Sequence, residues 1–152
     1  MSDPLAFPEI TPRYSLPMLF AGQAQKEVTV NEALSCMDTL LHAAIAGESA
    51  TPPANPSPGE TWLVASGGTG PWASHDGDLA VWTDGGWRFT APKPGMRVFD
   101  ITLGIFRHYH QNWTETAAPA GPQGGDVVDS QARQAIAELV ATLCNAGIFS
   151  SG

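Results

Sequence analysis

Apolar residues recur at helical spacing in two stretches of the chain. Between Thr29 and Gly47 they follow one another at steps of three or four residues, which places them on one side of an α-helix. Thr29 and Glu32 form a capping-box pattern for its first turn. The same spacing over residues 129–152 predicts an amphipathic C-terminal helix that ends in a Schellman turn at Gly147. The two apolar stripes are Val30, Leu34, Met37, Leu41 and Ile45, and then Ala132, Ile136, Leu139, Val140 and Leu143.

Between these helices the pattern changes to short runs that are bounded by Gly, Pro and Asp, as strands and tight turns require. Asp84-Gly85-Gly86 predicts a hairpin, because glycine supplies the positive φ of a tight turn. In the strand before it both alternate faces are apolar, so we expect that strand to be covered on both sides. Five strands are predicted, and together they form a small antiparallel sheet of Trp-rich hairpins: Thr61–Ala65, Asp78–Thr83, Trp87–Ala91, Arg97–Ile101 and Ile105–Tyr109.

Prolines interrupt the first 22 residues at a spacing of four or five. Because proline fixes φ and lacks an N–H donor, this stretch is expected to be extended. Its many apolar residues predict an arm that lies across its own domain or a neighbouring subunit. The sequence therefore predicts an α+β fold in four parts: an extended Pro-rich arm (1–22), an α+β core (23–116), a Gly/Pro linker (117–128) and a C-terminal helix (129–152).

Charge limits the classes of partner. The 152 residues include only 7 Lys and Arg against 15 Asp and Glu, a net charge of −8. Such a chain has few cations with which to displace the counterions of nucleic acid, so we expect no nucleic-acid partner. No apolar run is long enough for a membrane span, and the N-terminus lacks the pattern of a secretory signal, so we expect no membrane association and assembly in the cytoplasm. Low charge and many aromatic residues favour a chain that covers much of its surface with other subunits.

No enzyme signature emerges from the chain, and we expect neither catalytic residues nor a cofactor. The glycine-rich stretch Gly67–Gly70 lacks the lysine and the following helix of a phosphate loop. No nucleophile motif is present, and the acidic residues at turns and strand ends nominate no pair for a hydrolase. His108 and His110 share one face of a strand, as metal ligands sometimes do, but no Cys, Asp or Glu at ligand spacing accompanies them. We therefore expect no metal site, and the role of the two histidines stays open.

The aromatic residues allow two interpretations. Trp72, Trp82, Trp87 and Tyr109 are candidates for a platform on which sugar rings stack, or they form the core of a sheet that has few aliphatic residues. Trp62, Trp87 and Trp113 follow one another at similar intervals, which is a weak signal of a tandem hairpin repeat.

Several short motifs resemble one known family. Residues 15–45 contain a Leu-Pro pair, then Gly-Gln-Ala-Gln-Lys and then Val-Thr-Val-Asn-Glu-Ala-Leu. The likeness continues to about residue 115 through Gly59-Glu60, Gly70-Pro71-Trp72-Ala73, Gly86-Trp87-Arg88-Phe89 and Pro94-Gly95-Met96. This combination resembles a domain of unknown function in head-spike and tail-fibre proteins of alphaproteobacterial phages and gene transfer agents. It is most similar to the base protein of the head spike.

The resemblance implies a structural virion protein. Such a base subunit would form a ring, expected to be a pentamer at a five-fold capsid vertex, and would join the capsid protein to a receptor-binding spike fibre protein. The alternative is a module that itself binds host capsule polysaccharide through the aromatic residues named above. The expected capsid contacts are Phe7, Tyr14, Leu16 and Phe20, and the expected oligomer or fibre contacts are Ile136, Leu139, Val140 and Leu143.

Overall fold

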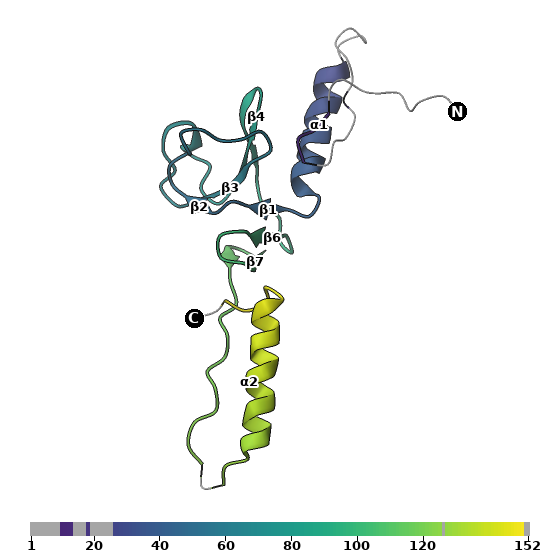
Figure 1. Cartoon of the computed structure of the whole chain (residues 1–152). Coiled ribbons are helices and arrows are strands. Elements are labelled where there is room, and N and C mark those ends of the chain that lie inside the picture. The colour runs from purple at the N-terminus through teal and green to yellow at the C-terminus, as the bar shows by residue number, and fades with distance from the viewer. Residues whose placement is uncertain (1–9, 14–17, 19–25, 126, 151–152) are drawn as a thin grey trace, which may run out of the picture. The chain divides into compact units, whose positions relative to one another are not determined.

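The computed structural model describes residues 10–13, 18, 26–125 and 127–150, which belong to two compact units (Figure 1). The units are Met1–Ala43 with Glu48–Ala91, and Ala44–Gly47 with Pro92–Gly152. Within the described residues, each unit holds one α-helix and one four-stranded mixed sheet. The chain is therefore α+β, as predicted, but the single antiparallel sheet is wrong. The two strands that make the sheets mixed have two residues each, too few to produce a readable alternation of polar and apolar positions.

The sheet of the first unit has the order β2-β3-β4-β5. β2 (Glu48–Ser49) pairs in parallel with β3 (Thr61–Val64). β3 then pairs antiparallel with β4 (Leu79–Thr83), and β4 with β5 (Gly86–Thr90). Thr83 is opposite Gly86 in this last pair, which confirms the hairpin predicted from Asp84-Gly85-Gly86.

The sheet of the second unit repeats this topology with the order β1-β6-β7-β8. β1 (Ala44–Ile45) pairs in parallel with β6 (Arg97–Asp100). β6 pairs antiparallel with β7 (Ile105–Tyr109), which pairs antiparallel with β8 (Trp113–Thr114). Only two residues, Ala46 and Gly47, separate β1 from β2, which belongs to the other sheet. The five strands predicted from sequence all exist, with ends that differ by at most one residue.

Aromatic side chains fill one face of the first sheet. Alternation places Trp62 and Val64 of β3 on the same face as Ala80 of β4, and Trp62 is opposite Ala80 in the ladder. Trp72, from the 3₁₀ helix η1 (Gly70–Trp72), packs against this face and is fully buried. Leu79 and Val81 are buried on the opposite face, so the prediction that this strand is covered on both sides is confirmed.

The first helix, α1, spans Lys26–Leu40. Two sequence predictions about it are wrong. Thr29 lies inside the helix rather than at its cap, and Gly47 does not end it. The chain leaves the helix at His42, which adopts a left-handed φ of 47°, and Ile45 belongs to strand β1.

The second helix, α2, spans Ser130–Asn145 and has both predicted ends. The Asp129 side chain accepts a hydrogen bond from the amide of Ala132 at 3.0 Å. At the other end, the amide of Ile148 donates to Leu143 O and that of Gly147 to Cys144 O, both at 2.9 Å. With φ of 71° at Gly147, this is the predicted Schellman turn.

A buried ion pair joins two strands of the second sheet. The Asp100 side chain, 1% exposed, accepts a hydrogen bond from Arg107 Nε at 3.0 Å and further bonds from the amides of Thr102 and Leu103. These bonds fix the turn between β6 and β7 and satisfy the carboxylate. Among the described residues, no helix combines the length and hydropathy that crossing a bilayer requires.

Candidate functional site

The four aromatic residues proposed as a ligand platform differ in burial and in the unit to which they belong. Trp72 is 0% exposed, so it is a core residue and offers no ring face to a sugar. Trp82 and Trp87 are half-buried partners across the β4–β5 ladder, with ring centroids 5.1 Å apart in an edge-to-face arrangement. Tyr109 belongs to the other unit, where it packs against Trp113 at 5.2 Å. Within the first unit, the Trp82–Trp87 pair therefore remains as the candidate stacking surface among these residues.

Sequence reasoning missed the part that Trp62 takes in the aromatic face. Its ring lies 6.5 Å from that of Trp72, which lies 5.0 Å from Trp87. The Trp62 indole donates to Glu60 Oε1 at 2.7 Å, and Glu60 Oε2 accepts from the amide of Ser57. The alternation of Trp62 with Val64 along one strand is the signal that could have placed this residue in the core.

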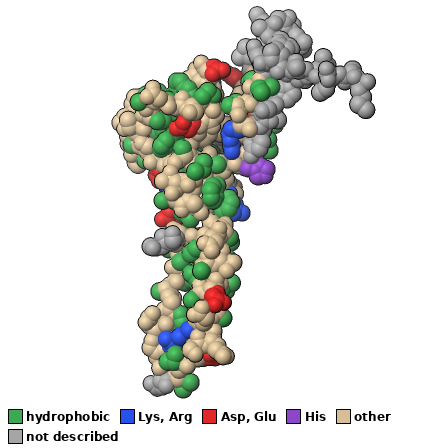
Figure 2. Space-filling model, viewed as in Figure 1, with side chains coloured by type: hydrophobic (Ala, Val, Ile, Leu, Met, Phe, Trp, Pro, Cys, Tyr) green, Lys and Arg blue, Asp and Glu red, His purple; other side chains and the backbone are tan. Residues whose placement is uncertain are grey.

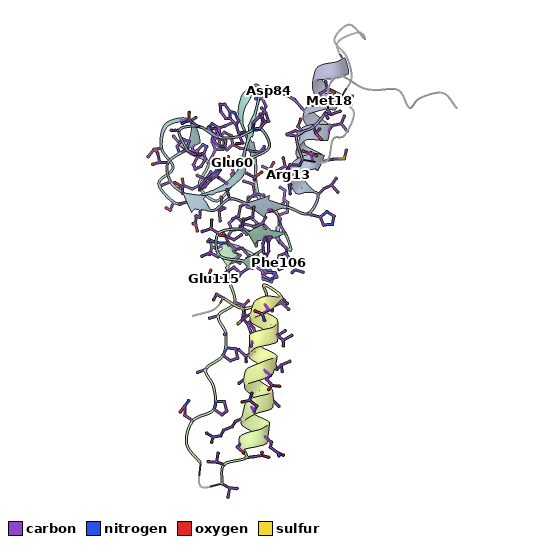
Figure 3. The ribbon with its side chains drawn as sticks, in the orientation of Figure 1. Arg13, Met18, Glu60, Asp84, Phe106 and Glu115 are labelled. Atoms are coloured by element: carbon purple, nitrogen blue, oxygen red, sulfur yellow. The ribbon has the colours of Figure 1, made fainter. Side chains whose placement is uncertain are left out.

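The N-terminal arm is fixed to the end of α1 by residues that sequence reasoning did not select. Asp38, buried in the last turn, accepts a hydrogen bond from Thr11 Oγ1 at 2.7 Å and one from the Arg13 amide at 2.9 Å. The guanidinium of Arg13 donates to the carbonyls of Asp38, Thr39 and His42 at 2.8–3.0 Å. Arg13 thus caps the negative end of the helix dipole and satisfies carbonyls that have no partner within the helix. Figure 3 shows Arg13 at this end of α1.

The same arm segment also contacts the loop that precedes β3. Gly59 has a φ of 79°, which favours glycine, and a Cβ there would lie 3.0 Å from Pro12 Cγ, so the arm lies close against this loop. Residues 10–13 therefore join α1 to the first sheet. The capsid contacts predicted on this arm, Phe7, Tyr14, Leu16 and Phe20, lie outside the described residues.

A cavity of about 630 Å³ lies between α1, the β4–β5 hairpin and the arm. Strand alternation directs Val81, Thr83 and Arg88 toward it, while the rings of the Trp82–Trp87 pair belong to the opposite face. Arg88 Nη2 lies 3.7 Å from Glu32 Oε1 of α1, and both side chains are exposed, so this pair contributes little stability. The helix side of the cavity is mainly polar, and its lining includes Asn31, Glu32, Ser35, Cys36 and Thr39.

The apolar stripe predicted on α1 does not face the sheet. Met37 is 50% exposed and Leu41 45%, and Val30 is also exposed. The polar side of α1 lines the cavity and holds the arm instead. The helix thus presents large apolar side chains to solvent, the arrangement expected of an interaction surface.

The four predicted contacts on α2 are exposed or half-buried. Ile136 is 45% exposed and Leu139 is 59%, while Val140 and Leu143 are half-buried. No residue of α2 is buried. Figure 2 shows hydrophobic side chains along the surface of this helix and the segment beside it.

The carboxylate of Asp76 binds the amides of the glycine-rich loop that begins at Gly67. Asp76 accepts hydrogen bonds from the amides of Gly67 and Gly68, each at 2.9 Å. These two bonds hold the pKa of Asp76 below its ordinary value. A Cβ at Gly68 would lie 2.5 Å from the carbonyl oxygen of Trp72, so the loop requires glycine there for close packing.

The histidines do not gather with other ligands. His75 Nδ1 lies 2.9 Å from Asp78 Oδ2, and its ring stacks on Phe89 with centroids 3.5 Å apart. His108 and His110 lie on β7 and just after it, and His110 is exposed. In the part of the chain that the structure describes, no three His, Cys, Asp or Glu side chains are placed to hold a metal ion.

Comparison with known proteins identifies one family. No curated protein matches the chain. A family model described as a protein of unknown function, DUF2793, matches residues 30–114, which include most of α1 and all eight strands and end before α2. Because this match covers more than half of the chain, the protein belongs to the DUF2793 family.

Proposed function

We propose that this protein is a structural subunit of a phage-like gene transfer agent, the base of a head spike. In this role copies form a ring that joins the capsid vertex to a receptor-binding fibre, and the protein is located in the particle after assembly in the bacterial cytoplasm. The proposal combines the sequence resemblance described above with the surface of the molecule. It assigns the chain no catalytic role.

One observation carries the proposal. Each helix is capped by specific contacts: Arg13 caps the C-terminal end of α1, and Asp129 and the Schellman turn cap α2. Both helices nevertheless leave large apolar side chains exposed. Large exposed apolar side chains on capped helices favour coverage by other subunits. In a closed ring each copy uses the same small contact repeatedly, so modest interfaces suffice for a stable assembly.

The decisive experiment removes the gene from a producing strain and images the particles by cryo-electron microscopy. We expect capsids with bare vertices and normal DNA content, and restoration of the spikes by the wild-type gene. Measurement of the mass of the purified protein in solution is the companion test, with a ring expected. Intact spikes on particles that lack the protein would refute the proposal.

The second candidate function is attachment to capsule polysaccharide by the protein itself. It is favoured by the half-buried Trp82–Trp87 pair, whose edge-to-face rings lie on a hairpin. Aromatic faces of this kind can stack on sugar rings. A pull-down with purified capsule, comparing wild type with Trp82→Ala, separates the two functions. A monomer that binds capsule and loses binding on this substitution supports attachment, whereas a ring that ignores capsule supports the spike base.

A further inference from the structure

Apolar residues of α2 follow a regular spacing along the helix. Ala132, Ile136, Leu139 and Leu143 follow one another at steps of four, three and four residues, the spacing of the a and d positions of a heptad. They therefore form one stripe along the helix, here called the α2 seam. Its two central side chains, Ile136 and Leu139, are about half exposed.

Contacts within the same chain leave the seam open. Residues 117–125 run back along α2 (Figure 1), and Arg133 donates from Nη1 to Pro122 O at 3.2 Å and from Nη2 to Gly124 O. Val140 lies seven residues after Arg133 on the same flank and is half-buried. The returning segment thus covers this flank, while Ile136 and Leu139 in the adjacent seam stay exposed.

Tertiary packing does not account for the stability of α2. The helix is joined to the second sheet at its C-terminal end, where the amide of Phe106 donates to Gly147 O at 2.7 Å. From Ser130 to Asn145 no residue is buried. A helix of this length is only marginally stable in water unless an apolar face is covered. Another apolar surface is therefore needed to cover the α2 seam.

The charge distribution favours further copies of the same chain as the partner that covers the seam. α2 contains one arginine and one glutamate and is neutral, in a chain with a net charge of −8. Arg133 is bonded to the returning segment, and Glu138 accepts from Gln134 at 2.8 Å, so neither charge lies in the seam. Identical, strongly acidic chains can therefore meet along α2 with little electrostatic repulsion.

The size of the helix indicates how many copies meet. At about 1.5 Å per residue α2 is roughly 24 Å long, so one face offers only a few hundred Å². A stable pairwise interface needs roughly 800 Å² per partner. A bundle in which each α2 contacts two neighbours, combined with other ring contacts, meets this requirement better than a single pair does.

We propose that α2 associates with α2 of other copies through its seam, in a parallel bundle on the symmetry axis of the ring. This inference rests on the proposed ring, because cyclic symmetry is what makes the copies of α2 parallel. It adds that α2 is the element that joins the copies and that the joined helices run parallel.

The first test compares Leu139→Glu with Ala141→Glu in the full-length chain, using sedimentation equilibrium over a range of concentrations. Both changes place the same charge on an exposed position of α2, but Ala141 lies outside the seam. We expect Leu139→Glu to reduce the mass to that of one chain or to weaken association by at least tenfold, and Ala141→Glu to leave it unchanged. An unchanged mass for Leu139→Glu would overturn the proposal.

A second measurement avoids the risk that Leu139→Glu only unfolds the helix. In a background of Cys36→Ser and Cys144→Ser, the single variants Leu139→Cys, Ala132→Cys and Ala141→Cys are treated with a short bifunctional maleimide. A parallel bundle predicts cross-linked copies for Leu139→Cys and Ala132→Cys and none for Ala141→Cys. Equal cross-linking of all three, or of none, would refute the bundle.

The outcomes also separate this inference from the proposed function. A ring that survives Leu139→Glu overturns the α2 bundle and leaves the spike base standing. If the copies cross-link through the seam, but particles made without the protein have unchanged vertices, the bundle is supported and the spike base is overturned. A wild-type chain that stays a single molecule overturns both.

Discussion

The two sheets of this protein share one topology but are stabilised by different side chains. In each sheet a two-residue strand pairs in parallel with the first strand of an antiparallel meander. The first sheet has an aromatic face, with Trp72 fully buried against it. The second buries the aliphatic residues Ile45, Val98 and Ile105 and also holds the buried Asp100–Arg107 pair and the turn that ends α2. The same strand order is thus compatible with a tryptophan-rich core and with an aliphatic core that includes an ion pair.

The comparison also corrects the predicted tandem repeat. Trp87 and Trp113 do occupy corresponding last strands, β5 and β8, but Trp62 lies on β3, which corresponds to β6. The repeated feature is the strand pairing, and the even spacing of the three tryptophans does not follow it. Pairing through the backbone needs no common side chain, so this repeat leaves little trace in the sequence.

The largest expected effect comes from the centre of the aromatic core. Trp72→Ala should destabilise the first unit by about 4 kcal/mol, because it removes a fully buried indole and leaves a cavity. Urea unfolding followed by amide NMR signals from both units measures this, with the signals of the second unit as an internal reference. Trp82→Ala is the matched control and should cost clearly less, because its side chain is only half-buried. Equal losses for the two variants would contradict the assignment of Trp72 as the core residue.

A smaller effect is expected from the buried ion pair of the second unit. Asp100→Ala should cost about 3 kcal/mol, because it removes the buried carboxylate that pairs with Arg107 and accepts from two turn amides. The same NMR-detected unfolding experiment should show the loss in the second unit. Glu115→Ala, at an exposed position of that unit, should change stability by less than about 0.5 kcal/mol. If Asp100→Ala lowers the free energy of unfolding no more than Glu115→Ala does, the ion pair does not stabilise the second unit.

The sequence was informative wherever structure depends on neighbours along the chain. Strand alternation, the Asp84-Gly85-Gly86 hairpin and both ends of α2 are local features, and all three predictions are confirmed. The start of α1 is the exception. The Thr29–Glu32 pattern suits a cap, but the helix continues toward the N-terminus as far as Lys26.

The features that sequence reasoning missed depend on partners far apart in the chain. Asp38 binds Thr11 at a separation of 27 residues, and Arg13 caps α1 by donating to carbonyls 25 to 29 residues further along the chain. One clue was present, because an acidic residue in the last turn of a helix opposes the dipole and needs a partner. The periodicity of α1 likewise identified its apolar side but not which way that side faces, and it faces solvent.

The smallest expected effect concerns the Asp76 loop of the first unit. Its folded-state pKa is lowered by the amides of Gly67 and Gly68, so the carboxylate stabilises the unit above its unfolded pKa of about 3.9. This contribution is lost as the pH falls through the lower, folded value. Wild type should therefore lose more stability than Asp76→Asn between pH 5 and pH 2 in urea unfolding, and the two should differ least at the acidic end. Other carboxyl groups titrate in both proteins, so the difference between the two curves of stability against pH isolates the contribution of Asp76. Parallel curves would show that its two amide bonds do not favour the charged form.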